Sequence, residues 1–270
     1  MSHDLVTAST YLFVPANRPD RVEKAIATGV DEVIVDLEDA VGESEKDVAR
    51  QKLAAMKPSR NLCVRINDES TSLFDADLEA IAGLPWVKAV VVPKVNNAVQ
   101  VKRVLEMLEA GVKVLALIET ARGIRDADAI AESGAARLLF GTADYASDLD
   151  APPVHQLYDY ARARLVVASA AAGLRPPVDG PTLEVADDEK LRIDTEFSRS
   201  LGMGGKLCIH PRQVPIVRSA FESDNGAQDW ARAILDGYEA NDGNVFVLDG
   251  QMIDAPLVTR ARRLLDHYSS

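Results

Sequence analysis

The stretch VEKAIATGVDEVIVDLEDAVGESEKD, residues 22–47, joins a helical pattern, a short apolar strand and an acidic loop. Its apolar run Val33–Val35 leads directly into Asp36, and Glu38 and Asp39 follow. Three carboxylates beside a core strand repel one another and lose hydration, which costs free energy. The arrangement favours a site that holds a cation or tunes an acid. A structural role, as a helix cap or as partners of a nearby arginine, is the alternative.

The same strand–helix unit recurs along the chain. Apolar runs of strand length, each followed by a helical pattern, are predicted at residues 10–14, 32–36, 62–67, 89–94, 112–119, 137–141, 178–180 and 205–210. Continuous rather than alternating apolar residues indicate strands that are buried on both faces. Units repeated at roughly 25-residue spacing therefore predict an α/β fold, a closed (β/α)8 TIM barrel. An open doubly wound sheet is the alternative, but no GxGxxG motif follows the first strand.

The residues beyond the eighth unit form a C-terminal extension. We expect a catalytic barrel over residues 1–225 and an extension over residues 226–270, packed on the barrel or on a neighbouring subunit. In the extension, VFVLDGQMID predicts a hairpin around Asp249–Gly250, and PLVTRARRLLDHY predicts a basic amphipathic helix.

Composition excludes several classes of function. The formal net charge of −12 argues against nucleic-acid binding through a global positive field. No apolar run approaches the roughly 20 residues of a membrane span, and the first residues carry no pattern of a signal peptide. Cys63 and Cys208 lie in apolar runs, and we expect them to be reduced core residues. The sequence thus predicts a cytoplasmic protein without nucleic-acid or membrane partners.

Polar residues gather at the carboxyl ends of the predicted strands, where TIM barrels place their active sites. They are Arg18, Asp36, Glu38, Asp39, Arg65, Asn67, Lys94, Glu119, Thr120, Arg122, Asp144, Asp179, His210 and Arg212. Carboxylates alone would repel, so we expect a divalent cation. Oxygen ligands without a His/Cys cluster point to Mg²⁺ or Mn²⁺ rather than zinc. The arginines would supply bidentate partners for substrate carboxylates or phosphates.

Structural roles remain open for several of these residues. Arg65 would serve only to neutralise the acidic loop, Asp144 would cap a loop, and His210 would be a core histidine before a proline. Glu119, at the end of an apolar strand, is the hardest to assign to structure alone.

These motifs, in this order, resemble the citrate lyase β-subunit family, the CitE-like branch of the HpcH/HpaI aldolases. The matching segments span nearly the whole chain: YLFVPANRPDRVEKA, VDEVIVDLEDAVGESEKDVAR, LCVRIN, VVVPKV, LALIETARGI, LLFGTADYASDLDA, GKLCIHPRQV and GQMIDAPLVTRARRLL. DLEDAV, IETARG and IHPRQ taken together are specific, whereas any one of them alone would be weak.

The resemblance implies a barrel that binds Mg²⁺ and cleaves or forms a carbon–carbon bond next to a thioester. It implies Glu119 and Asp144 as the metal ligands and Arg65 as the catalytic residue at the carboxylate and enolate end of the substrate. Glu38 and Asp39 would assist catalysis from beside the metal or its bound water. Such proteins are commonly trimers or multiples of trimers, which predicts a homotrimer or hexamer.

Four further residues complete the expected site. Arg18, Lys94 and Arg122 would bind the substrate or its coenzyme A portion, and Asp254 would reach a neighbouring subunit's site as an acid or base. The aldolases that act on free hydroxy-keto acids use a histidine near the end of the second strand. The corresponding DLEDAVGE has none, which favours the thioester-acting branch.

We therefore expect a Mg²⁺-dependent lyase that splits or forms malyl-, citramalyl- or citryl-CoA, with an acyl-CoA and a 2-oxo acid as products. A malyl-CoA-type thioesterase, a Mg²⁺-dependent aldolase on free 2-oxo acids and a non-catalytic binding subunit are the alternatives. Because the protein is acidic, coenzyme A needs a local basic rim, for which Arg18, Arg21, Lys24 and Arg122 are candidates.

Overall fold

In the computed structural model, which describes residues 5–222 and 225–268, eight parallel strands close into a barrel in their order along the chain. They are β1 (Thr10–Pro15), β2 (Glu32–Asp36), β3 (Leu62–Arg65), β4 (Val87–Val92), β5 (Lys113–Ile118), β6 (Arg137–Phe140), β7 (Val178–Asp179) and β8 (Gly205–Cys208). Pairing of β1 with β8 closes the ring. The predicted TIM barrel is confirmed.

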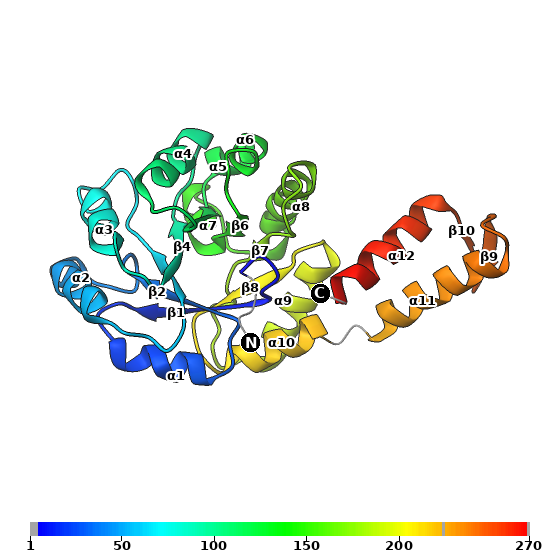
Figure 1. Cartoon of the computed structure of the whole chain (residues 1–270), viewed down its shortest axis with the longest axis horizontal. Coiled ribbons are helices and arrows are strands. Elements are labelled where there is room, and N and C mark those ends of the chain that lie inside the picture. Colours follow the sequence, from blue (N-terminus) through cyan, green and yellow to red (C-terminus); the bar gives the residue numbers. More distant parts are fainter. Residues whose placement is uncertain (1–4, 223–224, 269–270) are drawn as a thin grey trace. The chain divides into compact units, whose positions relative to one another are not determined.

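Helices follow the strands and lie outside them (Figure 1). They are the 3₁₀ turns η1 (Pro19–Arg21) and η2 (Glu43–Glu45) and the helices α1 (Val22–Ala27), α2 (Lys46–Ala55), α3 (Phe74–Ile81), α4 (Ala98–Met107), α5 (Ala121–Arg125), α6 (Ala127–Ala131), α7 (Thr142–Asp148), α8 (His155–Ala171), α9 (Asp188–Ser200) and α10 (Gln213–Glu222). The apolar spacing of the sequence predicts one helix over residues 124–133, but the structure divides this segment at Asp126 into α5 and α6. The sequence also predicts a last barrel helix over residues 215–223, and its expected end, Ser223, lies outside the described residues.

Each barrel strand buries both of its faces. On β2, Ile34 packs inside the barrel, while Val33 and Val35 pack outward against the helices, and all three are fully buried. This is why the strands are continuous apolar runs in the sequence. Cys63 and Cys208 are free buried thiols, as expected, and burial raises the pKa of Cys208 to about 12.

A buried ion cluster lies beside the two-residue strand β7. The carboxylate of Asp179 accepts hydrogen bonds from Arg162 Nε on α8 and from Lys206 Nζ on β8, both at 2.8 Å. Lys206 Nζ also donates to the carbonyl oxygen of Gly180 at 2.8 Å. Asp179 was predicted at the carboxyl-terminal rim of the barrel, where the active site is expected (the active rim). It instead links β7 to α8 and β8. Burial alone would raise the pKa of Asp179, but the two cations hold it below its usual value.

The described residues from 222 onward, 222 and 225–268, form a second compact unit. It contains α11 (Asn225–Ala240), the strands β9 (Phe246–Leu248) and β10 (Gln251–Ile253), and α12 (Ala255–Tyr268). The predicted hairpin and final helix are confirmed. Asp249 and Gly250 have φ angles of 50° and 81°, as a type I′ turn requires. The sequence patterns did not predict α11, and the expected boundary after residue 225 adjoins residues 223–224, which are not described.

No helix within the described ranges is both long and apolar enough to cross a membrane.

We expect the substitution Asp179→Asn to lower the free energy of unfolding by about 3–5 kcal/mol at pH 7, because two buried cations lose their carboxylate. Since the folded-state pKa of Asp179 is lowered, its stabilising contribution is present above about pH 4 and is lost as the pH falls through the folded value. The variant should lack this part of the acid dependence. Urea unfolding at a series of pH values measures both effects.

Asp128→Asn is the matched control, because Asp128 also pairs with an arginine of α8, Arg164, but is exposed. Its stability should change little. Equal losses in the two variants would contradict the importance of the buried cluster.

Candidate active site

A cavity of about 820 Å³ opens at the carboxyl ends of the barrel strands. Its polar lining includes seven of the predicted site residues: Arg18, Asp36, Asp39, Arg65, Glu119, Asp144 and His210. Two more, Glu38 and Lys94, contact this set directly. Phe13, Leu117 and Leu207 belong to the apolar part of the lining. The barrel therefore brings together residues that are far apart in the sequence, as the strand-end pattern predicted.

Arg65 is the centre of the acidic loop. Its Nε and Nη2 donate to the two carboxylate oxygens of Asp36 at 2.7 and 2.6 Å, and the two residues are neighbours in the β2–β3 register. Nη1 lies 2.9 Å from Glu38 Oε2 and 3.4 Å from Asp39 Oδ2. Burial opposes the charge of Arg65, but the carboxylates outweigh this and raise its pKa. Arg65 does neutralise the acidic loop, and it also lines the cavity.

Lys46, at the start of α2, fixes the loop that carries Asp36, Glu38 and Asp39 (the acidic loop). The Lys46 ammonium is buried and donates to the carbonyl oxygens of Leu37 and Glu38 and to Asn67 Oδ1, at 2.8, 2.7 and 2.8 Å. The Asn67 amide nitrogen Nδ2 donates in turn to Asp77 Oδ2 at 2.6 Å. Lys46 thus fixes the backbone that carries Glu38. In the sequence, only its place near the start of a helical pattern distinguishes Lys46 from other lysines.

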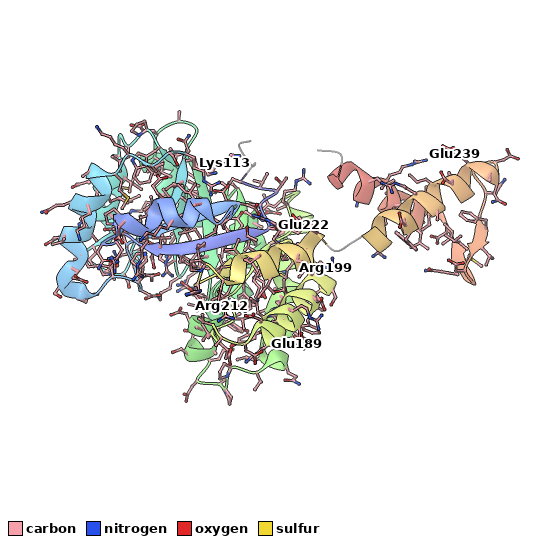
Figure 2. The ribbon with its side chains drawn as sticks, turned by 90° about the horizontal axis from the view of Figure 1, so that it is seen from below. Lys113, Glu189, Arg199, Arg212, Glu222 and Glu239 are labelled. Atoms are coloured by element: carbon pink, nitrogen blue, oxygen red, sulfur yellow. The ribbon has the colours of Figure 1, made fainter. Side chains whose placement is uncertain are left out.

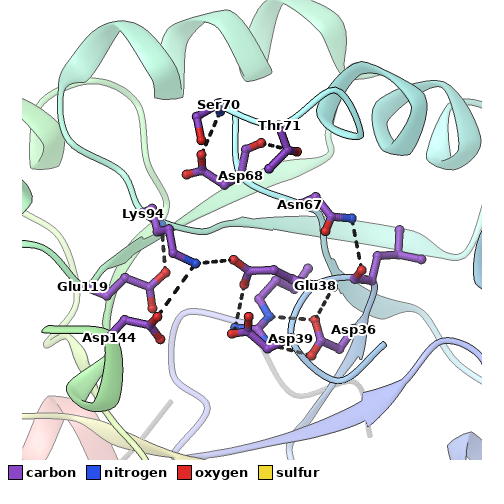
Figure 3. Close-up of polar contacts among 12 residues, drawn as sticks. Asp36, Glu38, Asp39, Asn67, Asp68, Ser70, Thr71, Lys94, Glu119 and Asp144 are labelled. Carbon is purple, nitrogen blue, oxygen red and sulfur yellow. Dashed lines mark hydrogen bonds and ion pairs between the residues drawn. The ribbon is translucent and has the colours of Figure 1, made fainter. Parts of the chain in front are cut away.

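Lys94 joins the two halves of the site (Figure 3). Its backbone nitrogen donates to Glu119 Oε1 at 2.9 Å, while its side-chain Nζ donates to Glu38 Oε1 at 2.6 Å and lies 3.9 Å from Asp144 Oδ1. The backbone φ of Lys94 is 49°, a left-handed conformation that costs a non-glycine residue on the order of 1 kcal/mol. In this conformation the backbone nitrogen of Lys94 contacts Glu119 while its side chain contacts Glu38.

Glu119 is buried where like charges meet. Burial, followed by the nearby carboxylates of Glu38 and Asp144, raises the pKa of Glu119 to about 8. The side chain packs against Gly141 at the end of β6, where a Cβ would lie 2.6 Å from the Cβ of Glu119. Asp144 enters the site from the first turn of α7, a helix that the sequence patterns did not predict. The concentration of negative charge calls for a cation.

The residues present fit a Mg²⁺ ion. The donors are all carboxylate oxygens, and Glu38 Oε2 is buried without a hydrogen bond from any described residue, although Arg65 is near. No group of three or more potential ligands is assembled within residues 5–222 and 225–268. Mg²⁺ suits such a site, because it commonly takes one or two carboxylates and completes its shell with water and substrate oxygens. Glu119 and Asp144 would supply the two carboxylates.

Basic side chains line the same cavity from the loop and helix after β1. Arg18 pairs with Asp20 through bonds of 2.9 and 3.0 Å, so its charge is partly offset. Arg21 and Lys24 also line the cavity and form no ion pair with any described residue. These two side chains are therefore available to an anionic ligand.

Arg122, Arg212 and Asp254 are not among the residues that line the cavity. Arg122 is exposed on α5, directly after β5, and is absent from the described lining. Asp254 belongs to the second unit, where its Oδ1 accepts a hydrogen bond from Leu257 N at 3.3 Å at the start of α12. Its catalytic role stays a prediction. Arg212, labelled in Figure 2, pairs with Asp188 of α9 at 2.8 Å, whereas His210 lines the cavity.

Comparisons with known proteins show what this chain is similar to. The family model described as HpcH/HpaI aldolase/citrate lyase matches residues 9–211. The citrate lyase subunit beta-like protein of Mycobacterium tuberculosis is 34% identical over 265 residues, which cover 94% of this chain and 93% of that protein. The (3S)-malyl-CoA thioesterase of Cereibacter sphaeroides is 30% identical over 276 residues, which cover 98% and 96% of the two chains.

A solved structure extends the likeness to three dimensions. The crystal structure of the protein CitE from Mycobacterium tuberculosis, in complex with magnesium, acetoacetate and coenzyme A, matches with a TM-score of 0.86 and 33% identity. The match covers 98% of this chain and 100% of that chain, so it includes the second unit as well as the barrel.

The contact between Gly141 and Glu119 predicts that Gly141→Ala will weaken Mg²⁺ binding roughly tenfold or more, because the new methyl group displaces the carboxylate of Glu119, an expected metal ligand. Isothermal titration with Mg²⁺ measures the effect. Gly42→Ala is the control, since a Cβ at Gly42 meets no atom within 4 Å. Unchanged affinity in the Gly141 variant would show that Glu119 does not need its present position to bind the metal.

Proposed function

Because the chain belongs to the HpcH/HpaI aldolase/citrate lyase family, we propose that it is a cytoplasmic Mg²⁺-dependent carbon–carbon lyase that acts on a 3-hydroxy-carboxyacyl-CoA thioester. One observation carries the proposal. Arg65, Glu119 and Asp144 line the same cavity as Arg21 and Lys24, which have no ion-pair partner among the described residues. The cavity thus combines a metal-binding end with a basic end suited to a large anionic substrate.

The proposed reaction is a retro-Claisen or retro-aldol cleavage. Glu119 and Asp144 would hold Mg²⁺, which supplies Lewis acidity toward the carboxylate and hydroxyl oxygens of the substrate. Glu38 or Asp39 would take the hydroxyl proton, directly or through water. The carbon–carbon bond then breaks, and its electron pair passes to the thioester portion as an enolate, while the other fragment becomes a 2-oxo acid. Asp254 or water would protonate the enolate carbon to give the acyl-CoA.

Arg65 is suited to stabilise the charge that develops on the substrate. Its guanidinium is fixed by Asp36 before any substrate arrives, so little reorganisation is needed during the reaction. The ring of Phe13 lies 4.6 Å from the guanidinium carbon and limits its movement further. Such a preorganised cation is most effective in a site from which water is largely excluded.

The coenzyme A portion would extend toward α1. Its phosphates carry the negative charge that Arg21 and Lys24 can accept, and the protein's overall charge of −12 makes such local cations necessary. The solved CitE structure contains coenzyme A together with magnesium and acetoacetate, which supports the same combination of ligands. A homotrimer or hexamer, with Asp254 serving a neighbouring subunit, completes the proposal.

A thioesterase is the second candidate, because a relative at 30% identity carries the name (3S)-malyl-CoA thioesterase. In that reaction water would attack the thioester carbonyl, and free coenzyme A would be released. The two activities share a substrate class and differ in the bond that breaks.

A panel assay tests the proposal. Malyl-, citramalyl-, methylmalyl- and citryl-CoA are supplied with Mg²⁺ or with EDTA, and released 2-oxo acid and free thiol are measured separately. We expect 2-oxo acid without thiol, only when Mg²⁺ is present. Thiol release would favour the thioesterase. Activity on 2-oxo acids and aldehydes alone would indicate a free-acid aldolase, and Mg²⁺-dependent ligand binding without turnover would indicate a binding subunit.

The double substitution Arg21→Ala/Lys24→Ala should raise the KM for the CoA thioester roughly tenfold and leave kcat nearly unchanged, because uniform binding to the phosphates is lost. A pantetheine thioester, which lacks the nucleotide, should be turned over equally by both proteins. Lys102→Ala on α4 removes an exposed charge outside the cavity lining and serves as the control. An unchanged KM would place the nucleotide elsewhere.

A further inference from the structure

The active rim holds more negative charge than positive charge. Its five carboxylates and two cations are those of Asp36, Glu38, Asp39, Glu119, Asp144, Arg65 and Lys94. Arg65 is engaged by the three acids of the loop after β2. On the opposite side, Lys94 lies 3.9 Å from Asp144, and it shares the neighbourhood of Glu119 with Arg65.

Lys94 and Arg65 differ in how firmly they are held. The side chain of Arg65 is 9% exposed and bound through two parallel hydrogen bonds to Asp36. The side chain of Lys94 is 32% exposed, and its Nζ makes one short contact with Glu38 and a looser one of 3.9 Å with Asp144. A lysine ammonium on a flexible stem can leave such contacts without disturbing the backbone. The Lys94 backbone nitrogen would keep its bond to Glu119 meanwhile.

We propose that the Lys94 ammonium is an internal counter-cation of the metal-free site, which competes with Mg²⁺ for the rim carboxylates and leaves them when the metal binds. This inference deepens the proposed function and rests on its metal site.

The competition follows from the positions of the charges. The ammonium lies among Glu38, Asp144 and Glu119, and a dication held by Glu119 and Asp144 would lie close to it. Two cations repel strongly at such distances in a partly buried site. The ammonium can relieve this repulsion by turning into the cavity, where an anionic substrate would be its new partner. Metal binding would thereby prepare the site for the substrate.

A simpler role for Lys94, as a substrate ligand that never interacts with the metal, predicts a different result. In that case its removal would weaken substrate binding and leave the affinity for Mg²⁺ unchanged or reduced. The competition predicts tighter Mg²⁺ binding when the ammonium is removed.

Isothermal titration of Lys94→Gln with Mg²⁺, in the absence of any thioester, separates the two. We expect the variant to bind Mg²⁺ roughly tenfold more tightly than the wild type. Lys94→Arg keeps the charge and should stay close to the wild type. Lys88→Gln is the matched control, because Lys88 lies on β4, the strand that precedes Lys94, and pairs with an acid of β2, Glu32, at 2.7 Å. Its Mg²⁺ affinity should not change. Unchanged or weaker binding in Lys94→Gln would overturn the proposal.

A measurement on the wild-type protein avoids any effect of substitution on folding. Lysines are labelled briefly with acetic anhydride, in EDTA or in saturating Mg²⁺, and the extent at each lysine is read by mass spectrometry. Labelling of Lys94 should rise severalfold with Mg²⁺, while Lys88 stays constant. Equal or lower labelling of Lys94 in Mg²⁺ would refute the release of the ammonium.

Both tests are independent of the reaction. If no thioester is cleaved but Mg²⁺ binds more tightly to Lys94→Gln, the proposed substrate is wrong and the competition stands. If thioesters are cleaved and the variant binds Mg²⁺ as the wild type does, the competition alone is wrong.

Discussion

The pairing of Arg65 with Asp36 is the interaction on which the arrangement of the site depends. The barrel register sets these residues side by side on β3 and β2, so their planar groups meet through two hydrogen bonds. A buried guanidinium cannot lose its proton, and it therefore requires carboxylates around it. This requirement draws Glu38 and Asp39 toward the cavity. Ion pairs of this kind contribute little net stability, because desolvation offsets the attraction, so the cluster is better explained by function.

On the side of the rim opposite the acidic loop, a small residue and a backbone contact position the Glu119 carboxylate. Gly141 leaves room for the Glu119 carboxylate, and the Lys94 backbone nitrogen orients it. Lys46 supports the loop from the other side through neutral carbonyl acceptors. The site therefore rests on strand ends and on a buried hydrogen-bond network. Such support is what precise positioning of catalytic groups requires.

The sequence was sufficient for the barrel and for most of the rim, because strand ends and continuous apolar runs are local patterns. Prediction from the sequence failed where the role of a residue depends on partners that are far from it in the chain. The buried triad around Asp179 could not be distinguished from an active-site acid, since both follow a strand and its partners lie on α8 and β8. Lys46 resembled any lysine on an exposed helix. Short helices such as α7 depend on packing more than on periodicity, which is why Asp144 was predicted in a loop.

The two ends of β2 and β4 show how surroundings decide the role of one chemical pair. At the amino end, Glu32 and Lys88 form an ion pair of 2.7 Å. The buried side chain of Arg137 donates a hydrogen bond to the Tyr11 hydroxyl at 3.0 Å. At the carboxyl end, Glu38 and Lys94 form a pair of 2.6 Å, but two further carboxylates and an open cavity adjoin it. Beside the first pair, Glu32 Oε2 also accepts a hydrogen bond from the Cys63 thiol at 3.8 Å. The second has an excess of acids that can exchange one cation for another, and this excess is what makes it suitable for metal-dependent chemistry.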